Sequence, residues 1–263
     1  LNPLSTAHLS QGHIRKTKTD KVDARTIAEQ LRMGHFKPAI VPDEEAFHLR
    51  QLTRLRYKLS NHASVLRNRL CACLDRYFPE LQTVFSSIWL RTPRNLLQIA
   101  PLPCDVAQMD PQELTAIFRS SSQGRFGHEQ ASRLIRAAKN SVGIKSASSA
   151  ARVEISSLTA LVDEIERKMS TIKAEIKLSL AGQQQFLTTV PGINELTAAT
   201  ILGEIGNISL FGSPGALVAF AGLDPSTFQT GTFEGSRSRV PKRGSVYPVS
   251  YTHLRAHETS LHL

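Results

Sequence analysis

The stretch Leu187-Thr-Thr-Val-Pro-Gly-Ile-Asn-Glu-Leu-Thr-Ala-Ala-Thr200 decides how the C-terminal part of this chain folds. Its Pro-Gly pair predicts a tight turn between two apolar helices, a helix-hairpin-helix. Such a hairpin leaves backbone N–H groups at a helix start, where they can hold a phosphate. We therefore predict that Gly192, Ile193 and Asn194 contact a nucleic-acid backbone. Asn194 stands where such motifs more often carry glycine, and asparagine tolerates a positive φ there. A hairpin that serves only for packing is the alternative.

A hydroxyl-rich loop that becomes basic follows the hairpin. The chain reads Gly222-Leu-Asp-Pro-Ser-Thr-Phe-Gln-Thr-Gly231, and four cations then fall within seven residues: Arg237, Arg239, Lys242 and Arg243. Closely spaced cations beside hydroxyl groups fit the clamping of phosphates. A solvated loop would also account for them.

The composition favours a polyanionic partner. The 263 residues carry a formal net charge of +10, with a pI of about 9.9 and 41% hydrophobic residues. No run approaches the roughly 18 apolar residues of a membrane span, and no signal peptide is evident, so we expect no membrane association. Three cysteines without disulfide or zinc spacing indicate a reducing cytoplasm.

Two carboxylates lie close together near the N-terminus. The segment Lys18-Thr-Asp-Lys-Val-Asp-Ala24 begins a helix expected from about Thr19 to Met33, ending near Gly34. Asp20 and Asp23 then share one helix face and can share a hard cation such as Mg²⁺. Alternatively, Asp20 is an N-cap and Asp23 belongs to a capping box.

Two long helices are predicted in the middle of the chain. The first spans about Asp43 to Tyr77 and is rich in cations, since residues 1–91 hold 15 Lys/Arg against 8 Asp/Glu. Those cations form either a solvated face or a face along a nucleic-acid backbone. They are Arg50, Arg54, Arg56, Lys58, Arg67 and Arg69.

The second long helix carries a heptad pattern over about 152–180. Its apolar positions are Leu158, Val162, Ile165, Met169, Ile172 and Ile176. This pattern predicts a coiled coil between two chains, which would make a homo-oligomer through residues 158–176. A long amphipathic helix that packs within its own chain is the alternative.

The acidic motif and the hairpin together resemble the DEDD-type transposases of the bacterial IS110 family. The family's RuvC-like, ribonuclease-H-type domain carries four acids, and Lys-Thr-Asp-x-x-Asp-Ala holds the last two, which match Asp20 and Asp23. The resemblance implies that these two bind Mg²⁺, that the first Asp and the Glu lie upstream, and that this chain is an N-terminally truncated fragment without activity of its own.

The resemblance also implies a hydroxyl nucleophile. The family places a serine before glycine in the loop after Gly-Leu-x-Pro, and this serine attacks DNA to form a covalent link. Here that position is Thr230, whose extra methyl group crowds an in-line attack, and Ser226 is the second candidate. Both hydroxyls could instead serve turn geometry. The implied partners are DNA and a guide RNA from the element, in the nucleoid of a bacterial cytoplasm.

The expected fold is mostly α. We expect a helical remnant of the RuvC-like domain with the following long helix over 1–91, and a helical linker with the coiled-coil segment over 92–183. A small helix-hairpin-helix domain with a basic catalytic loop follows over 184–247. Residues 248–263 have no clean periodicity, resemble a sequencing adapter, and are expected to be foreign to the protein.

The sequence therefore predicts a DNA transposase that cuts and rejoins strands with carboxylate-bound Mg²⁺ and a hydroxyl nucleophile. Two other functions remain open. The chain could be a DNA-binding module without catalysis, in which the aspartates only cap a helix. It could also be a RuvC-like junction nuclease that needs no hydroxyl nucleophile.

Overall fold

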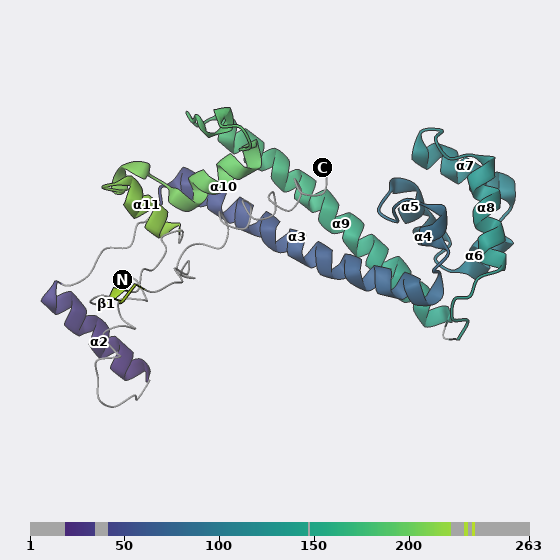
Figure 1. The fold of residues 1–263 in the computed structure, drawn as a ribbon, viewed down its shortest axis with the longest axis horizontal. Coiled ribbons are helices and arrows are strands. Elements are labelled where there is room, and N and C mark those ends of the chain that lie inside the picture. The colour runs from purple at the N-terminus through teal and green to yellow at the C-terminus, as the bar shows by residue number, and fades with distance from the viewer. Residues whose placement is uncertain (1–18, 35–41, 147, 222–228, 231–232, 235–263) are drawn as a thin grey trace. The chain divides into compact units, whose positions relative to one another are not determined.

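The computed structural model describes residues 19–34, 42–146, 148–221, 229–230 and 233–234 (Figure 1). Within these ranges the chain is helical apart from two strands, β1 (Gln229–Thr230) and β2 (Phe233–Glu234), which pair antiparallel. The prediction of a mostly α fold is confirmed. That any of the helices belong to a RuvC-like domain stays a prediction.

The chain divides into two compact units, one from residues 1–50 with 200–263 and the other from residues 51–199. The predicted boundaries after residues 91, 183 and 247 follow motifs, whereas this division follows contacts between segments. The predicted domains remain a prediction of the sequence.

Two long helices dominate the second unit. α3 (Glu44–Tyr77) and α9 (Ser148–Ala181) each contain 34 residues, and α3 beyond Arg50 lies beside α9 (Figure 1). Glu44 and Glu45 occupy the first turn of α3, where a helix dipole favours acids. Both predicted helices are confirmed, and their ends differ from the predicted ones by at most four residues.

The heptad stripe of α9 is partly covered within its own chain. Leu158, Val162 and Ile176 are buried, at 5%, 0% and 1% exposure, although no second chain is present. Leu158 belongs to one apolar cluster with Leu70 and other residues at the end of α3. Packing within the chain therefore covers these three positions, whereas Ile165, Met169 and Ile172 are half-buried, and a homo-oligomer through residues 158–176 stays a prediction.

A module of short helices connects α3 to α9, at the end where α3 stops and α9 starts (Figure 1). The sequence predicted only a helical linker there, without the limits of its helices. The helices are α4 (Leu81–Val84), α5 (Arg91–Ile99), α6 (Pro103–Gln108), α7 (Pro111–Ser122) and α8 (His128–Lys139). The start of α7 is fixed by proline and aspartate: Pro111 follows Asp110, whose carboxylate accepts from the backbone N–H of Gln112 and Glu113.

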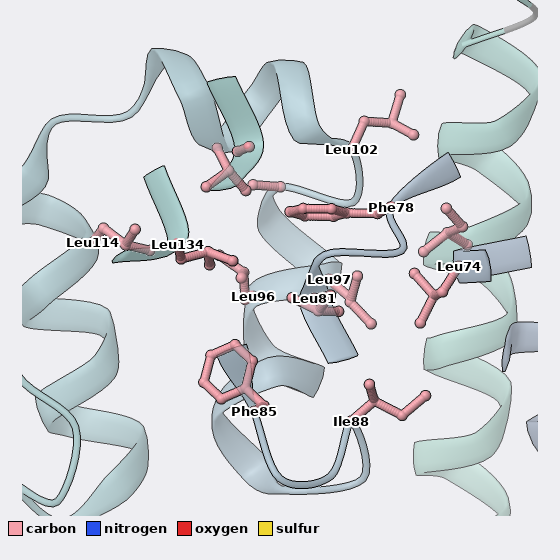
Figure 2. Packing of buried hydrophobic residues seen from close by; sticks show 14 of the residues in the cluster. Leu74, Phe78, Leu81, Phe85, Ile88, Leu96, Leu97, Leu102, Leu114 and Leu134 are labelled. Atoms are coloured by element: carbon pink, nitrogen blue, oxygen red, sulfur yellow. The ribbon is translucent and has the colours of Figure 1, made fainter. Parts of the chain in front are cut away.

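One apolar core joins this module to the ends of both long helices. Phe78, Leu96 and Leu114 are fully buried in it, and Figure 2 shows the labelled side chains converging between the short helices and the end of α3. Phe118 meets Phe85 edge to face, with ring centroids 5.5 Å apart. Each such side chain contributes about 1.5–3 kcal/mol when fully buried, so the core holds the module in place.

Ion pairs connect α9 to its neighbours. Glu166 accepts hydrogen bonds from Arg67 of α3 and from Arg94 of α5, and Arg94 also binds Asp163 at 2.7 Å. Burial raises the pKa of the Glu166 carboxyl, but the bonds from Arg67 and Arg94 outweigh it and leave the pKa below its usual value. The network replaces water around these charges with fixed partners.

The cations of α3 therefore need a third interpretation besides a solvated face and a nucleic-acid face. Arg67 and Arg69 form salt bridges with Glu166 and Glu154 of α9. Arg50 donates to the backbone carbonyls of Gly203 (2.7 Å) and Glu204 (3.0 Å). Arg50 and Arg67 therefore connect segments of the fold, whereas Arg69 is exposed and its salt bridge is compatible with a solvated face.

The first unit contains the end of α10 (Glu195–Ile205) packed on the first turns of α3. The two backbones approach closely at Gly203, where a Cβ would lie 2.7 Å from the backbone nitrogen of Arg50. A 3₁₀ turn η2 (Ile208–Leu210) and helix α11 (Pro214–Phe220) follow, and Ser213 caps α11 through the N–H of Ala216. The contact at Gly203 positions α10, whose other end bears the hairpin.

Candidate nucleic-acid interface

The predicted Pro-Gly turn is present and has type II geometry. The backbone N–H of Ile193 donates to the carbonyl of Val190 at 3.0 Å, with Pro191 and Gly192 at the two central positions. Gly192 has φ 98°, which only glycine adopts readily. The segment before the turn is a single 3₁₀ turn, η1 (Leu187–Thr189), so the predicted apolar helix before the hairpin is wrong for residues 187–189.

Asn194 has a structural role as a helix cap, and its contact with a nucleic acid stays a prediction. Its Oδ1 accepts from the backbone N–H of Thr197 at 2.9 Å, and its carbonyl accepts from Ala198, also at 2.9 Å. Asn194 thus caps the start of α10. Among the described residues, Gln123 is the non-glycine residue with positive φ, so the left-handed position of the hairpin falls at Gly192 and not at Asn194.

A cavity of about 570 Å³ opens beside the hairpin, all within the unit of residues 51–199. Arg56 of α3 and Lys173 of α9 line it together with Ile193, Asn194 and Leu196. The start of α10 adds the positive end of a helix dipole. Residues from three distant segments therefore converge on the turn, and the fold brings Ile193 and Asn194 together with two cations.

The electrostatics of this cavity are mixed. Glu195 also lines it, in the first turn of α10, and its carboxylate competes with any phosphate for the positive end of the helix. Lys177 lies 3.4 Å from that carboxylate and offsets its charge. Lys173 has no ion-pair partner among the described residues and is available to an anion.

The signals for these lining cations in the sequence are weak. Arg56 was one of six cations on its helix, and Lys173 was not singled out among the charged residues of the heptad helix. Only the pairing of α3 with α9 shows that both reach the hairpin.

The acid pair lies at the start of α2 (Asp20–Met33), which ends at Gly34 with φ 68°. The N-cap is Thr19, whose side chain accepts from the backbone N–H of Val22 at 3.4 Å. The alternative that Asp20 is the N-cap and Asp23 belongs to a capping box is therefore wrong. Both acids stand in the first turn, Asp20 exposed and Asp23 half-buried.

These carboxylates do not form a complete metal site in the described part of the chain. No group of three or more His, Cys, Asp or Glu side chains is arranged there to hold a metal ion. Mg²⁺ prefers six oxygen ligands in octahedral geometry, and two carboxylates leave most positions to water or other residues. The pair fits part of a magnesium site.

The predicted nucleophile and basic loop are mostly outside the described residues. Thr230 lies in β1, where its backbone pairs with Phe233 of β2. Ser226 falls outside the described ranges, as do Arg237, Arg239, Lys242 and Arg243. Their roles stay predictions.

Among the helices that the structure describes, none is both long and apolar enough to cross a membrane.

Comparison with known proteins assigns the chain to a family. Residues 1–79, which include the acid pair, match a model for the DEDD part of IS110-type transposases. Residues 184–251, which include the hairpin, match a model described as "Transposase IS116/IS110/IS902 family". The second match runs into the segment 248–263 that was expected to be foreign.

Two curated relatives align with most of this chain. The uncharacterized 44.8 kDa protein of insertion element IS116 from Streptomyces clavuligerus is 26% identical over 246 residues, which are 92% of this chain and 60% of that protein. The uncharacterized 43.6 kDa protein of insertion element IS110 from Streptomyces coelicolor is 23% identical over 222 residues, 82% and 55% of the two chains. The chain thus spans 55–60% of the length of these relatives. With both family models matched in order, the chain belongs to the IS110/IS116/IS902 family of transposases.

Proposed function

We propose that this chain is the DNA-binding and partly catalytic portion of a transposase that cuts and rejoins the strands of an insertion sequence. The observation that carries the proposal is the order of the two family matches, one over the acid pair and one over the hairpin and the hydroxyl-rich loop. Of the four acids that the family resemblance implies, the proposal assigns two to Asp20 and Asp23.

The hairpin cavity is the proposed DNA contact. A backbone phosphate at the start of α10 would meet Lys173 and the guanidinium of Arg56. Contacts of this kind fix the position of a protein on DNA without reading its sequence. The non-catalytic DNA-binding module shares this step, so binding alone does not separate the two functions.

Asp20 and Asp23 are the proposed metal-binding residues. Membership of a DEDD family implies metal-dependent catalysis in general. When Mg²⁺ is bound, it neutralises charge on the reacting phosphate. The described residues supply only two of its ligands, so their part in the proposal is to hold carboxylate oxygens on one helix face.

Thr230 is the first candidate nucleophile and Ser226 the second. In this proposal the hydroxyl oxygen bonds to a DNA phosphorus atom, its proton goes to a base, and a DNA hydroxyl leaves. Rejoining reverses the exchange with another strand. A guide RNA that selects the sites, and a homo-oligomer that brings two sites together, complete the proposal in the bacterial nucleoid.

Binding of labelled duplex DNA to the chain tests the first step. Lys173→Ala should weaken binding several-fold, whereas Lys168→Ala, a matched exposed lysine on the same helix that faces Glu164, should change it little. Asp20→Asn should leave binding intact. A chain that fails to bind DNA, or equal losses in both lysine variants, would contradict the hairpin site.

Strand cutting by the complete transposase tests the second step. Asp20→Asn should abolish Mg²⁺-dependent cutting, with Glu29→Gln on the same helix as the control, and persistent cutting would favour a role for Asp20 outside catalysis. Thr230→Ala should remove a covalent protein–DNA adduct from a denaturing gel. If cutting of branched DNA persists without any adduct in the unaltered enzyme, the junction nuclease is the better interpretation.

A further inference from the structure

A second polar cavity lies in the module of short helices, apart from the hairpin. It has a volume of about 280 Å³ and lies between the start of α5 and the end of α7. An ordered water takes up about 30 Å³ of liquid volume, so the cavity has room for a larger polar group together with its hydration. Arg91, Thr92, Ser121, Ser122 and Arg125 contribute to its lining.

The two arginines of this cavity have no partner among the described residues. Neither the Arg91 side chain nor the Arg125 side chain takes part in a hydrogen bond or an ion pair there, and both residues are exposed. Arg94, one turn further along α5, binds both Asp163 and Glu166. Arg94 therefore stabilises the fold of the module, whereas Arg91 and Arg125 line an open polar cavity.

The start of α5 adds further donors. Leu90 at the N-cap provides no side-chain hydrogen bond, and no acidic residue occupies the first turn. Pro93 lacks an N–H, and the N–H of Arg94 bonds to the carbonyl of Leu90 at 3.3 Å. The amides of Arg91 and Thr92 therefore have no capping side chain, and the positive end of the dipole is uncompensated.

The end of α7 fixes the other wall. Ser121 is buried and its hydroxyl lies 3.0 Å from that of Thr92, which ties the two helix ends together. Gln123 and Gly124 both have positive φ, 55° and 84°, and reverse the chain so that Arg125 returns to the cavity. The N–H of Phe126 donates to Ser122 Oγ at 2.9 Å, so the loop has a defined form.

Charge around the cavity is one-sided. Residues 81–139 contain seven Lys/Arg and four Asp/Glu, and no carboxylate lines the cavity. Two of the acids are already used: Asp105 accepts from the N–H of Leu102 and pairs with Arg152, while Asp110 caps α7. Arginines, hydroxyls and a helix start are the donors that proteins use for phosphate groups.

We infer that this cavity binds a backbone phosphate of a nucleic acid, so that the module between α3 and α9 is a second nucleic-acid contact. Arg91 and Arg125 hold the phosphate oxygens, and the first amides of α5 complete the site. The inference is independent of the hairpin, because no residue is shared between the two cavities.

Fluorescence anisotropy tests the site. The affinity of the full chain for labelled duplex DNA, and for duplex RNA of the same sequence, is measured over a series of KCl concentrations. Arg91→Ala/Arg125→Ala should weaken binding about tenfold with at least one duplex, the order expected for lost charged hydrogen bonds. The slope of log affinity against log salt should fall by about 0.9 for one lost phosphate contact on DNA. Arg91→Lys/Arg125→Lys, which keeps both charges, should retain the slope.

Arg136→Ala/Lys139→Ala removes the same charge from exposed positions of α8, outside the cavity, and should preserve the slope. Equal losses in the two alanine pairs, no loss with either duplex, or a lysine pair that behaves like the alanine pair would each overturn the inference. Stabilisation by inorganic phosphate without any change in nucleic-acid affinity would also overturn it, in favour of a free-phosphate site. If the alanine pair loses helical circular dichroism, Arg91→Gln/Arg125→Gln replaces it. The Lys173→Ala variant keeps this cavity, so failure of one site is distinguishable from failure of the other.

Discussion

Replacing Gly203 by alanine tests the contact that packs α10 on α3. The position lies inside a helix, where alanine is favoured over glycine by about 1 kcal/mol. Against this gain, the new Cβ would lie 2.7 Å from the backbone nitrogen of Arg50 and 3.0 Å from its Cα. Carbon contacts are most favourable at about 3.5–4.0 Å, so the helices must separate by nearly an ångström or distort.

The cost of that separation exceeds the gain in propensity. Overpacking costs about 1–3 kcal/mol, and the shift also lengthens the hydrogen bonds from Arg50 to Gly203 and Glu204, now 2.7 and 3.0 Å. Hydrogen bonds from charged groups contribute about 1.5–3 kcal/mol each, of which part is lost. We expect a net destabilisation of α10 by about 1–2 kcal/mol, the difference between these costs and the propensity gain.

Hydrogen exchange of the α10 amides measures this local stability directly, because it reports opening of the helix without global unfolding. Gly215→Ala in α11 is the control, since its Cβ would find only Ser213 Oγ at 3.9 Å, an ordinary contact. The control should leave exchange unchanged or slow it. Slower exchange of α10 in Gly203→Ala, by the amount of the propensity gain, would refute the close approach of the two helices.

Three further perturbations follow from other parts of the fold. The pKa of Glu166 is depressed, so its ion pairs stabilise the fold at pH values above the unfolded pKa of about 4.3. This contribution is lost as the pH falls through the folded pKa. The melting temperature, measured by circular dichroism, should therefore fall more steeply between about pH 5 and 3 in the unaltered chain than in Glu166→Gln. Gly192→Ala places a side chain at φ 98° and should destabilise the turn by about 1–2 kcal/mol. It should also weaken DNA binding, measured by fluorescence anisotropy. Unchanged affinity would argue against the hairpin contact. Phe118→Ala should lower the free energy of unfolding by about 3–5 kcal/mol in urea, whereas Val142→Ala, at 84% exposure, should leave it nearly unchanged.

The long helices were predictable because their signals are local. α2 has a polar residue before it and Gly34 after it, and α3 has acids in its first turn. The heptad pattern predicted α9 but not the helix that packs against it. A stripe of apolar residues states that a face is buried, and the sequence contains nothing that separates burial by α3 from burial by a second chain.

The module of short helices was not predictable in detail because its core is assembled from distant residues. Leu96, Leu114 and Leu134 come from three helices of only nine to twelve residues, and each helix is too short to be stable alone. Their packing, and not their individual periodicity, defines them. The phosphate cavity depends on the same packing, since Arg91 and Arg125 are 34 positions apart in the sequence.

Charge was the least informative part of the sequence for the same physical reason. Arg50, Arg67 and Arg69 look alike on a helical wheel, yet one binds backbone carbonyls and two bind carboxylates. A cation that is held in an ion pair is less available to a nucleic-acid phosphate than an unpaired one. The count of 32 Lys and Arg residues therefore overstates the cations available for a polyanion.

The start of α2 shows how a structural detail changes the weight of a functional prediction. Asp20 and Asp23 had two possible roles, capping and metal binding, and the residue types fit both. Thr19 accepts the capping hydrogen bond from Val22, so neither aspartate is needed for it. The helix dipole still favours acids at this end, but it favours them equally at any position of the first turn. Helix stability does not require the two acids to share a face, and the proposed shared cation would use this spacing.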